Sequence, residues 1–233
     1  MGRPVHYSTE VPARCQALIE MLVDKVESQS DPEGRWGGPL KTTFLLAMAT
    51  PMLVLPLERV FKPVIWGKPG IADDVSLDPA LEARIADVFS PGRSFDHAPF
   101  YEPQTWTFIP ECPAFEVARD WPEDCLRQLG SPDAAASAGR ADASQILISV
   151  RNALSHGGIT YLDRDGRHTR SATNMLGFAS LVRQHDPTRL RLLRATVTGF
   201  EAFLRLWAGW LSAAGVTDEL DERGPGYFSQ AAE

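Results

Sequence analysis

Hydrophobic side chains recur at helical spacing near the start of the chain. Between residues 10 and 28 the apolar positions stand three or four residues apart, which places them on one face of an amphipathic helix. From Phe44 to Leu57 nearly every residue is apolar, but this stretch is too short to span a membrane and contains Pro51 and Pro56. We therefore expect a buried, kinked core helix there rather than a membrane segment.

The middle of the chain has a less regular pattern. Helices are expected after Asp78 and between Asp120 and Gly130, because a polar cap followed by proline is typical of a helix start. Many prolines and aromatic residues otherwise interrupt the region. We interpret residues 63 to 130, approximately, as an irregular insertion within a single domain that covers residues 1–217. The acidic tail, residues 218–233, is expected to be mobile.

A second amphipathic helix is predicted to begin at Asp142, where Gln145 stands in the N3 position of a capping box. It is predicted to end at Gly157-Gly158, since glycine is the usual helix stop. Beyond it, the apolar run at residues 159–162 and the turn at residues 163–166 predict a short β-hairpin.

The last helix is predicted from Asp186 to Leu211. Asp186 would cap it, Pro187 would occupy its first turn, and apolar residues then follow an alternating three-four spacing. A helix with such a stripe must pack along another long helix, in this chain or in a partner. The pattern as a whole predicts a mainly α fold.

Composition narrows the class of protein. A chain of 233 residues with 44% hydrophobic content can bury a sizeable core. Its three cysteines, Cys15, Cys112 and Cys125, form no Cys-x-x-Cys pair, so neither a zinc site nor a disulfide scaffold is indicated. No secretory signal is visible after Met1. These features favour a reducing cytoplasm, with no membrane partner.

The charge distribution is more informative than the net charge. The net charge of −7 argues against a protein that coats nucleic acid non-specifically. Residues 151–194 nevertheless carry eight arginines against three aspartates, a balance of +5. Such a segment suits a local polyanion site, although solvated helix faces explain it equally well. Arg164, Arg167 and Arg170, in the predicted hairpin, are the candidate substrate-binding residues.

The clearest candidate chemistry lies in the sequence Arg151-Asn152-Ala153-Leu154-Ser155-His156. At about 3.6 residues per turn, Asn152 and His156 share a helix face, and the long Arg151 side chain can bend toward them. These side chains supply a fixed cation, an amide and a titratable imidazole. We expect the three to grip one phosphate together.

RNA is the polyanion on which this set could act without a metal or other cofactor. A neutral His156 could take the proton of a 2′-hydroxyl as that oxygen attacks the adjacent phosphorus, which leaves a 2′,3′-cyclic phosphate. Arg151 would hold the developing charge, and Asn152 would orient the substrate or the imidazole. A structural role for the same residues stays open, and it would be favoured if His156 were buried and bonded within its own core.

The motif also resembles that of a known superfamily. Arg151-Asn152, three residues and then His156 look like the Arg-polar-x3-to-5-His signature of the HEPN superfamily. The flanking Ile146-Leu147-Ile148 and the upstream stretch at residues 49–59 are similar to plasmid-borne HEPN proteins. The resemblance implies a helical bundle, often dimeric, in which two copies of the motif meet at a cleft and cut RNA without a metal. It implies catalytic roles for Arg151 and His156 and a supporting role for Asn152.

These observations predict a HEPN-like helical bundle with a short hairpin after the motif helix and an irregular middle insertion. The predicted function is a metal-independent endoribonuclease, in a toxin or defence setting, with Arg151, Asn152 and His156 as its catalytic residues. The expected partners are RNA, a second copy of the chain and an antitoxin or other regulatory protein. The alternative is a non-catalytic module for dimerisation or for binding a nucleotide or partner.

Overall fold

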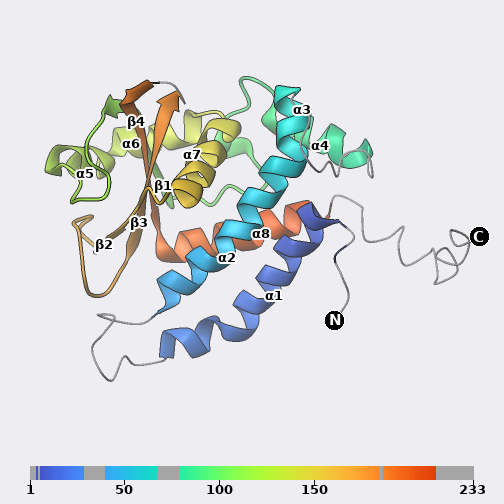
Figure 1. The fold of residues 1–233 in the computed structure, drawn as a ribbon, viewed down its shortest axis with the longest axis horizontal. Helices are drawn as coiled ribbons and strands as arrows, with labels where there is room; N and C mark the ends of the chain where they lie inside the picture. The colour runs from blue at the N-terminus through green and yellow to red at the C-terminus, as the bar shows by residue number, and fades with distance from the viewer. Residues whose placement is uncertain (1–3, 5, 29–39, 68–78, 184–185, 214–233) are drawn as a thin grey trace, which may run out of the picture.

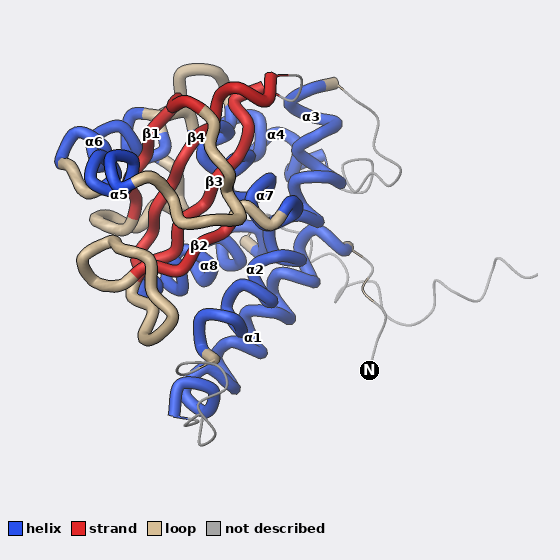
Figure 2. Tube along the Cα trace, turned by 60° about the vertical axis from the view of Figure 1, so that its left-hand side comes forward, coloured by secondary structure: helices blue, strands red, loops and turns tan. Residues whose placement is uncertain are grey.

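Helices pack against both faces of a four-stranded antiparallel sheet in the computed structural model of the chain (Figures 1 and 2). The structure describes residues 4, 6–28, 40–67, 79–183 and 186–213. The predicted HEPN-like helical bundle, mainly α with one short hairpin, is therefore wrong. The fold mixes α and β structure, and the sheet forms part of its hydrophobic core.

The elements have the following bounds. The helices are α1 (Tyr7–Ser28), α2 (Lys41–Pro56), the π-helix η1 (Leu57–Phe61), α3 (Lys62–Trp66), α4 (Pro79–Phe89), the 3₁₀-helix η3 (Phe95–His97), α5 (Glu123–Leu129), α6 (Pro132–Arg140), α7 (Ala143–His156) and α8 (Val197–Ser212). The strands are β1 (Trp106–Pro113), β2 (Ile159–Leu162), β3 (Met175–Arg183) and β4 (Asp186–Thr196).

The sheet has the order β1-β4-β3-β2, and all its neighbouring strands are antiparallel. One face packs on a large core shared with α1, α2, α7 and α8, whereas the other is covered by α5 and Trp121. Figure 2 shows α7, α8, α2 and α1 on the same side of the sheet. The motif helix α7 thus lies between the sheet and α2.

The predicted helix from Asp186 to Leu211 is wrong in its first half. Residues 186–196 form β4, which pairs with both β1 and β3, and only α8 is helical. The leucines of this segment fit a helix, but Arg189, Leu190, Arg191 and Leu192 also alternate polar and apolar as a strand does. Pairing with β1 and β3 satisfies the backbone hydrogen-bonding groups of β4. This long-range stabilisation favours the strand over the helix.

The predicted irregular insertion contains an unexpected strand. Trp106–Pro113 forms β1, which includes Pro110 and Pro113. A proline cannot donate to a ladder hydrogen bond and is tolerated at a sheet edge, and β1 is the edge strand beside β4. The register shifts between Ile109 and Cys112, on either side of Pro110. These prolines therefore mark an edge strand with an irregularity rather than the absence of a strand.

The predicted hairpin is present only in part. Ile159–Leu162 is a strand, and Gly166 closes a turn by donating its N–H to the Asp163 carbonyl oxygen at 3.1 Å. Along its length β2 pairs with the long strand β3, and the polar return contributes only an isolated antiparallel bridge, between Leu162 and His168. The helices predicted near the start of the chain, after Asp78 and between Asp142 and Gly157 are confirmed as α1, α4 and α7.

Prolines shape the apolar core helix. Pro56 has no N–H to donate to the carbonyl oxygen of Met52, four residues earlier. The indole Nε1–H of the fully buried Trp207 donates to that oxygen instead, at 2.8 Å. The helix then widens into the π-turn η1, which lies between Pro56 and Pro63. A π-turn thus follows Pro56, and α8 satisfies the backbone group that Pro56 leaves free.

The apolar helix extends beyond the stretch from Phe44 to Leu57 that was expected to be too short to span a membrane. By length and composition, one helix in the described part of the chain, Lys41–Ile65, could cross a membrane. Its Leu45, Ala49 and Met52 are fully buried among other protein side chains. The predicted tail at residues 218–233 lies outside the described residues.

We expect Trp207→Phe to lower the free energy of unfolding by about 1–3 kcal/mol more than Trp106→Phe does. Both tryptophans are buried, but the indole N–H of Trp106 has no partner among the described residues, whereas that of Trp207 satisfies Met52. Urea titration of both variants measures the difference. Equal losses would show that the Met52 hydrogen bond contributes nothing beyond packing.

Candidate functional site

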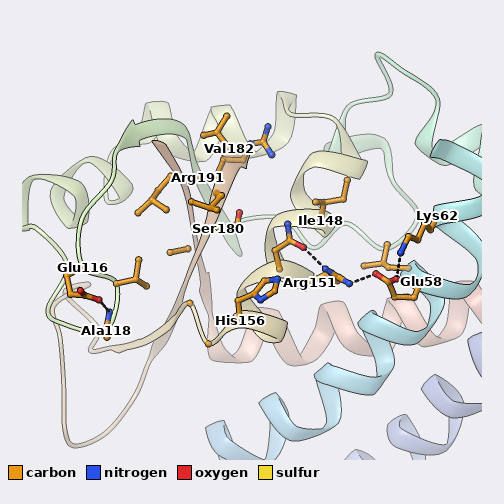
Figure 3. Close-up of a pocket in the computed structure, with 18 residues that line it drawn as sticks. Glu58, Lys62, Glu116, Ala118, Ile148, Arg151, His156, Ser180, Val182 and Arg191 are labelled. Atoms are coloured by element: carbon orange, nitrogen blue, oxygen red, sulfur yellow. Dashed lines mark hydrogen bonds and ion pairs between the residues drawn. The ribbon is translucent and has the colours of Figure 1, made fainter. Parts of the chain in front are cut away.

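The three predicted catalytic residues line one pocket of about 920 Å³ (Figure 3). Arg151, Asn152 and His156 project from the last turns of α7. Leu57, Glu58 and Lys62 form a second wall, and residues of β3 and β4 form a third. The structure therefore brings the predicted set together at an open cavity between helix and sheet.

Arg151 is held from two directions. Its Nη1 donates to Asn152 Oδ1 at 2.8 Å, and its Nη2 donates to Glu58 Oε1 in a charge-assisted contact. The Arg151 side chain is 25% exposed, and its buried Nε has no hydrogen-bond partner in the described part of the chain. A guanidinium has five N–H donors, so the two contacts orient it while leaving donors for a ligand.

Glu58 belongs to the site although the sequence did not single it out. It lies in η1, and its second carboxylate oxygen accepts from Lys62 Nζ at 2.9 Å. In the sequence, a glutamate four residues before a lysine resembles an ordinary solvated helix pair. The π-turn next to Pro56 and Pro63 brings it to Arg151, and no local sequence signal predicts that contact.

His156 is the last residue of α7 and is exposed. Among the residues that the structure describes, it has no hydrogen-bond or ion-pair partner, and Figure 3 shows its ring beside Arg151. The arrangement expected of a purely structural histidine, buried and bonded within its own core, is therefore not observed. Both ring nitrogens are free to exchange a proton with a ligand in the pocket.

The two glycines after His156 fix where the helix ends. Gly157 adopts φ +73°, a left-handed conformation that ends a helix and that other residues rarely adopt. Gly158 donates to the Ala153 carbonyl oxygen at 2.9 Å and accepts from the Ala179 N–H at 2.7 Å. A Cβ on Gly158 would overlap the Ala179 carbonyl oxygen. The glycine pair thus brings the end of α7 against β3.

The three predicted substrate-binding arginines do not enter this pocket. Arg164, Arg167 and Arg170 are exposed in the segment between β2 and β3. Arg170 lines a neighbouring pocket of about 530 Å³, which shares Val117, Ala118 and Gly157 with the first. Arg164 and Arg167 line neither of these two pockets.

Sequence reasoning missed the polar residues that the sheet contributes. Ser180 of β3 and Arg191 of β4 are register partners and line the pocket (Figure 3). Burial lowers the pKa of Arg191, and the Glu111 carboxylate partly offsets that shift. If the segment had been identified as a strand, the alternation of Arg189, Leu190 and Arg191 would have predicted that Arg191 lies on the sheet face opposite to Leu190.

The predicted insertion also contributes to the pocket. Glu116, Val117 and Ala118, which follow β1, lie along its rim, and Glu116 Oε1 accepts from the Ala118 N–H at 3.5 Å. The charged side chains that line the pocket are the cations Lys62, Arg151 and Arg191 and the anions Glu58 and Glu116. Cations are therefore in excess even with His156 neutral, which suits an anionic ligand.

No group of three or more His, Cys, Asp or Glu side chains that could hold a metal ion occurs within the described ranges. Cys112 and Cys125 interact with each other on the far side of the sheet, where burial raises the pKa of Cys112 to about 12. They lie outside the pocket.

Comparison with known proteins does not place the chain in a family: no family model, no curated protein and no solved structure matches it.

We expect Gly158→Ala to destabilise the protein by about 1–3 kcal/mol, because the added methyl group forces α7 away from the Ala179 carbonyl oxygen. Gly209→Ala provides the matched control, since a Cβ on that helical glycine meets nothing within 4 Å. Thermal unfolding of the two variants measures the difference. If the two variants unfolded at the same temperature, the close approach at Gly158 would have no energetic consequence.

Proposed function

We propose that the protein is a metal-independent endoribonuclease in which Arg151 and His156 are the catalytic residues and Asn152 positions Arg151. One observation carries the proposal. His156, which is exposed and has no partner among the residues that the structure describes, shares a cavity with an arginine that Asn152 and Glu58 hold in place. The excess of cations at this cavity suits a phosphodiester. The likeness of the motif to the HEPN signature supports the same assignment, independently of the fold.

The chemistry requires one proton acceptor and one fixed cation. His156 takes the proton of an RNA 2′-hydroxyl, and the resulting oxygen attacks the neighbouring phosphorus. The bond to the 5′-oxygen breaks, that oxygen takes up a proton from water, and a 2′,3′-cyclic phosphate remains; the His156 imidazolium then returns its proton to the solvent. Arg151 stabilises the charge that develops on the phosphoryl oxygens. Asn152 acts through Arg151, because its Oδ1 holds the guanidinium.

The proposal extends to the setting of the protein. We place it in the cytoplasm as a homodimer, with a partner such as an antitoxin that restrains its activity. Such restraint follows from the chemistry, since an unregulated ribonuclease would damage the RNA of its own cell.

We expect the purified protein to cleave mixed-sequence RNA in the presence of EDTA and to leave 2′,3′-cyclic phosphate ends. His156→Ala should reduce the cleavage rate by about 100-fold or more, because general base catalysis contributes 10²–10⁴-fold. A single 2′-deoxy substitution at the cleaved position should block cleavage by the parent. Gel electrophoresis of end-labelled RNA measures all three results.

His97→Ala is the matched control, since His97 is exposed but bonds to Ser94 and Asp96 outside the pocket. Its cleavage rate should equal that of the parent. Equal rates for the parent and His156→Ala, or no cleavage by either, would overturn the ribonuclease proposal.

The contact between Arg151 and Glu58 favours a second candidate, a non-catalytic binding module. In that case Arg151 serves only to join α7 to η1. Arg151→Gln and Glu58→Gln would then lose stability alike, and neither the variants nor the parent would cleave RNA. If Arg151 acts on the phosphate, Arg151→Gln should cleave at least tenfold more slowly than Glu58→Gln. Cleavage rates, compared with melting temperatures of the two variants, separate the candidates.

A further inference from the structure

The sheet wall of the pocket carries two polar groups that nothing in the proposed reaction uses. Arg191 Nε and Ser180 Oγ are buried atoms without a hydrogen-bond partner among the described residues. Among all the described residues, seven buried side-chain nitrogen and oxygen atoms lack a partner. Three of them belong to residues that line the pocket: Arg191 Nε, Ser180 Oγ and Arg151 Nε. Unmet hydrogen-bonding capacity is therefore concentrated around one cavity.

The strand pairing places the two groups side by side. Ser180 on β3 and Arg191 on β4 are direct partners in the antiparallel ladder, so their side chains lie on the same face of the sheet. Their neighbours on that face, Phe178 and Leu193, are also partners and belong to the core beneath α7. Ser180 and Arg191 thus lie on the sheet face that packs against α7, next to the hydrophobic core, and line the cavity.

Within the described residues, the contacts of Arg191 do not compensate for the burial of its positive charge. The nearby Glu111 carboxylate pairs with Arg189 at 3.5 Å and only partly offsets the burial of Arg191. Ser180 is 7% exposed, so its hydroxyl has little access to solvent. Arg191 as a whole is only partly buried, but its Nε and the Ser180 hydroxyl oxygen are buried and have no partner within the described ranges. Buried polar atoms without a partner lower stability, and a ligand that accepts hydrogen bonds would recover that loss.

We infer that Arg191 and Ser180 form a second phosphate subsite, which binds the backbone phosphate next to the one cleaved at Arg151 and His156. The inference rests on the proposed function for the identity of the ligand as an RNA strand. The cavity of about 920 Å³ is at the large end of ligand pockets, which leaves room for more than the reacting phosphate. Arg191 supplies the charge and a planar set of donors, and the Ser180 hydroxyl supplies one more.

The two subsites lie on different walls, as Figure 3 shows for Arg151 and His156 on α7 and for Ser180 on the sheet. An RNA strand held at both walls has two consecutive phosphates fixed relative to the imidazole of His156. Positioning of this kind contributes to rate by restricting the bound strand to a reactive geometry.

The experiment measures binding rather than cleavage, so that it does not depend on catalysis. A fluorescein-labelled 12-nucleotide RNA with 2′-O-methyl groups at every position lacks the attacking hydroxyl and cannot be cleaved. Fluorescence anisotropy at several salt concentrations then gives both the affinity and the slope of log K against log [salt]. Free phosphate and adenosine 5′-monophosphate, added as competitors, distinguish a strand subsite from a site for a small phosphate ligand.

Arg191→Gln should weaken binding by about tenfold or more and reduce the magnitude of the salt slope by about 0.7, the value for one lost phosphate contact on a single strand. Ser180→Ala should weaken binding a few-fold without changing the slope, since it removes no charge. Both variants should melt at or above the temperature of the parent, because each loses a buried polar atom, Arg191 Nε or Ser180 Oγ, that has no partner in the described part of the chain. A merely structural arginine would instead stabilise the fold, and Arg191→Gln would lower the melting temperature.

Arg189→Gln is the matched control, because it removes the same charge from an exposed position of β4 outside the pocket. The inference is overturned if Arg191→Gln and Arg189→Gln bind alike, or if Arg191→Gln keeps the parent's affinity and slope. It is also overturned if millimolar free phosphate or adenosine 5′-monophosphate displaces the RNA fully. If the parent binds as expected and yet cleaves nothing, the proposed reaction fails while the phosphate subsite stands.

Discussion

A backbone carbonyl in the middle of the core determines much of the arrangement. Pro56 leaves the Met52 oxygen without its helical donor, and a carbonyl that is buried in this way must find another partner. Trp207, 155 residues away along the chain, supplies it. This contact joins α2 to α8 and fixes the position of the π-turn that follows Pro56. The π-turn in turn carries Glu58 to Arg151, so the geometry of the candidate site depends on the requirement to satisfy one oxygen.

The sequence predicted the elements that local rules specify. The start at Asp142, the apolar face of α7 and the stop at Gly157 are encoded within about sixteen residues. The structure has the helix within those limits, although the Asp142 side chain makes no capping hydrogen bond. The three residues at its end were therefore placed together correctly. Proximity on a single helix turn requires no knowledge of the rest of the fold, which is why this part of the site could be found.

The elements that depend on distant partners were not predictable in the same way. Residues 186–196 carry both a helical and an alternating pattern, and pairing with β1 and β3 selects the strand. In β1, Pro110 and Pro113 disfavour a strand locally but are tolerated at an edge. Because the sheet was missed, its contribution to the pocket, Ser180 and Arg191, was missed too. The contact of Glu58 with Arg151 was missed for a related reason, since the π-turn that creates it lies 93 residues from its partner.

Together these contacts explain why the motif alone is an incomplete description of the site. A free guanidinium at the end of a helix has many rotamers, and it loses their entropy when it binds a ligand. Here the contacts with Asn152 and Glu58 already restrict Arg151, so less entropy remains to be lost on binding. The same carboxylate also neutralises part of the charge that an anion would meet. A second cation on the sheet wall, Arg191, restores the excess of positive charge without competing for Glu58. The residues that restrict the Arg151 side chain are thus different from the residue that supplies the excess positive charge on the sheet wall, and only the fold brings them together.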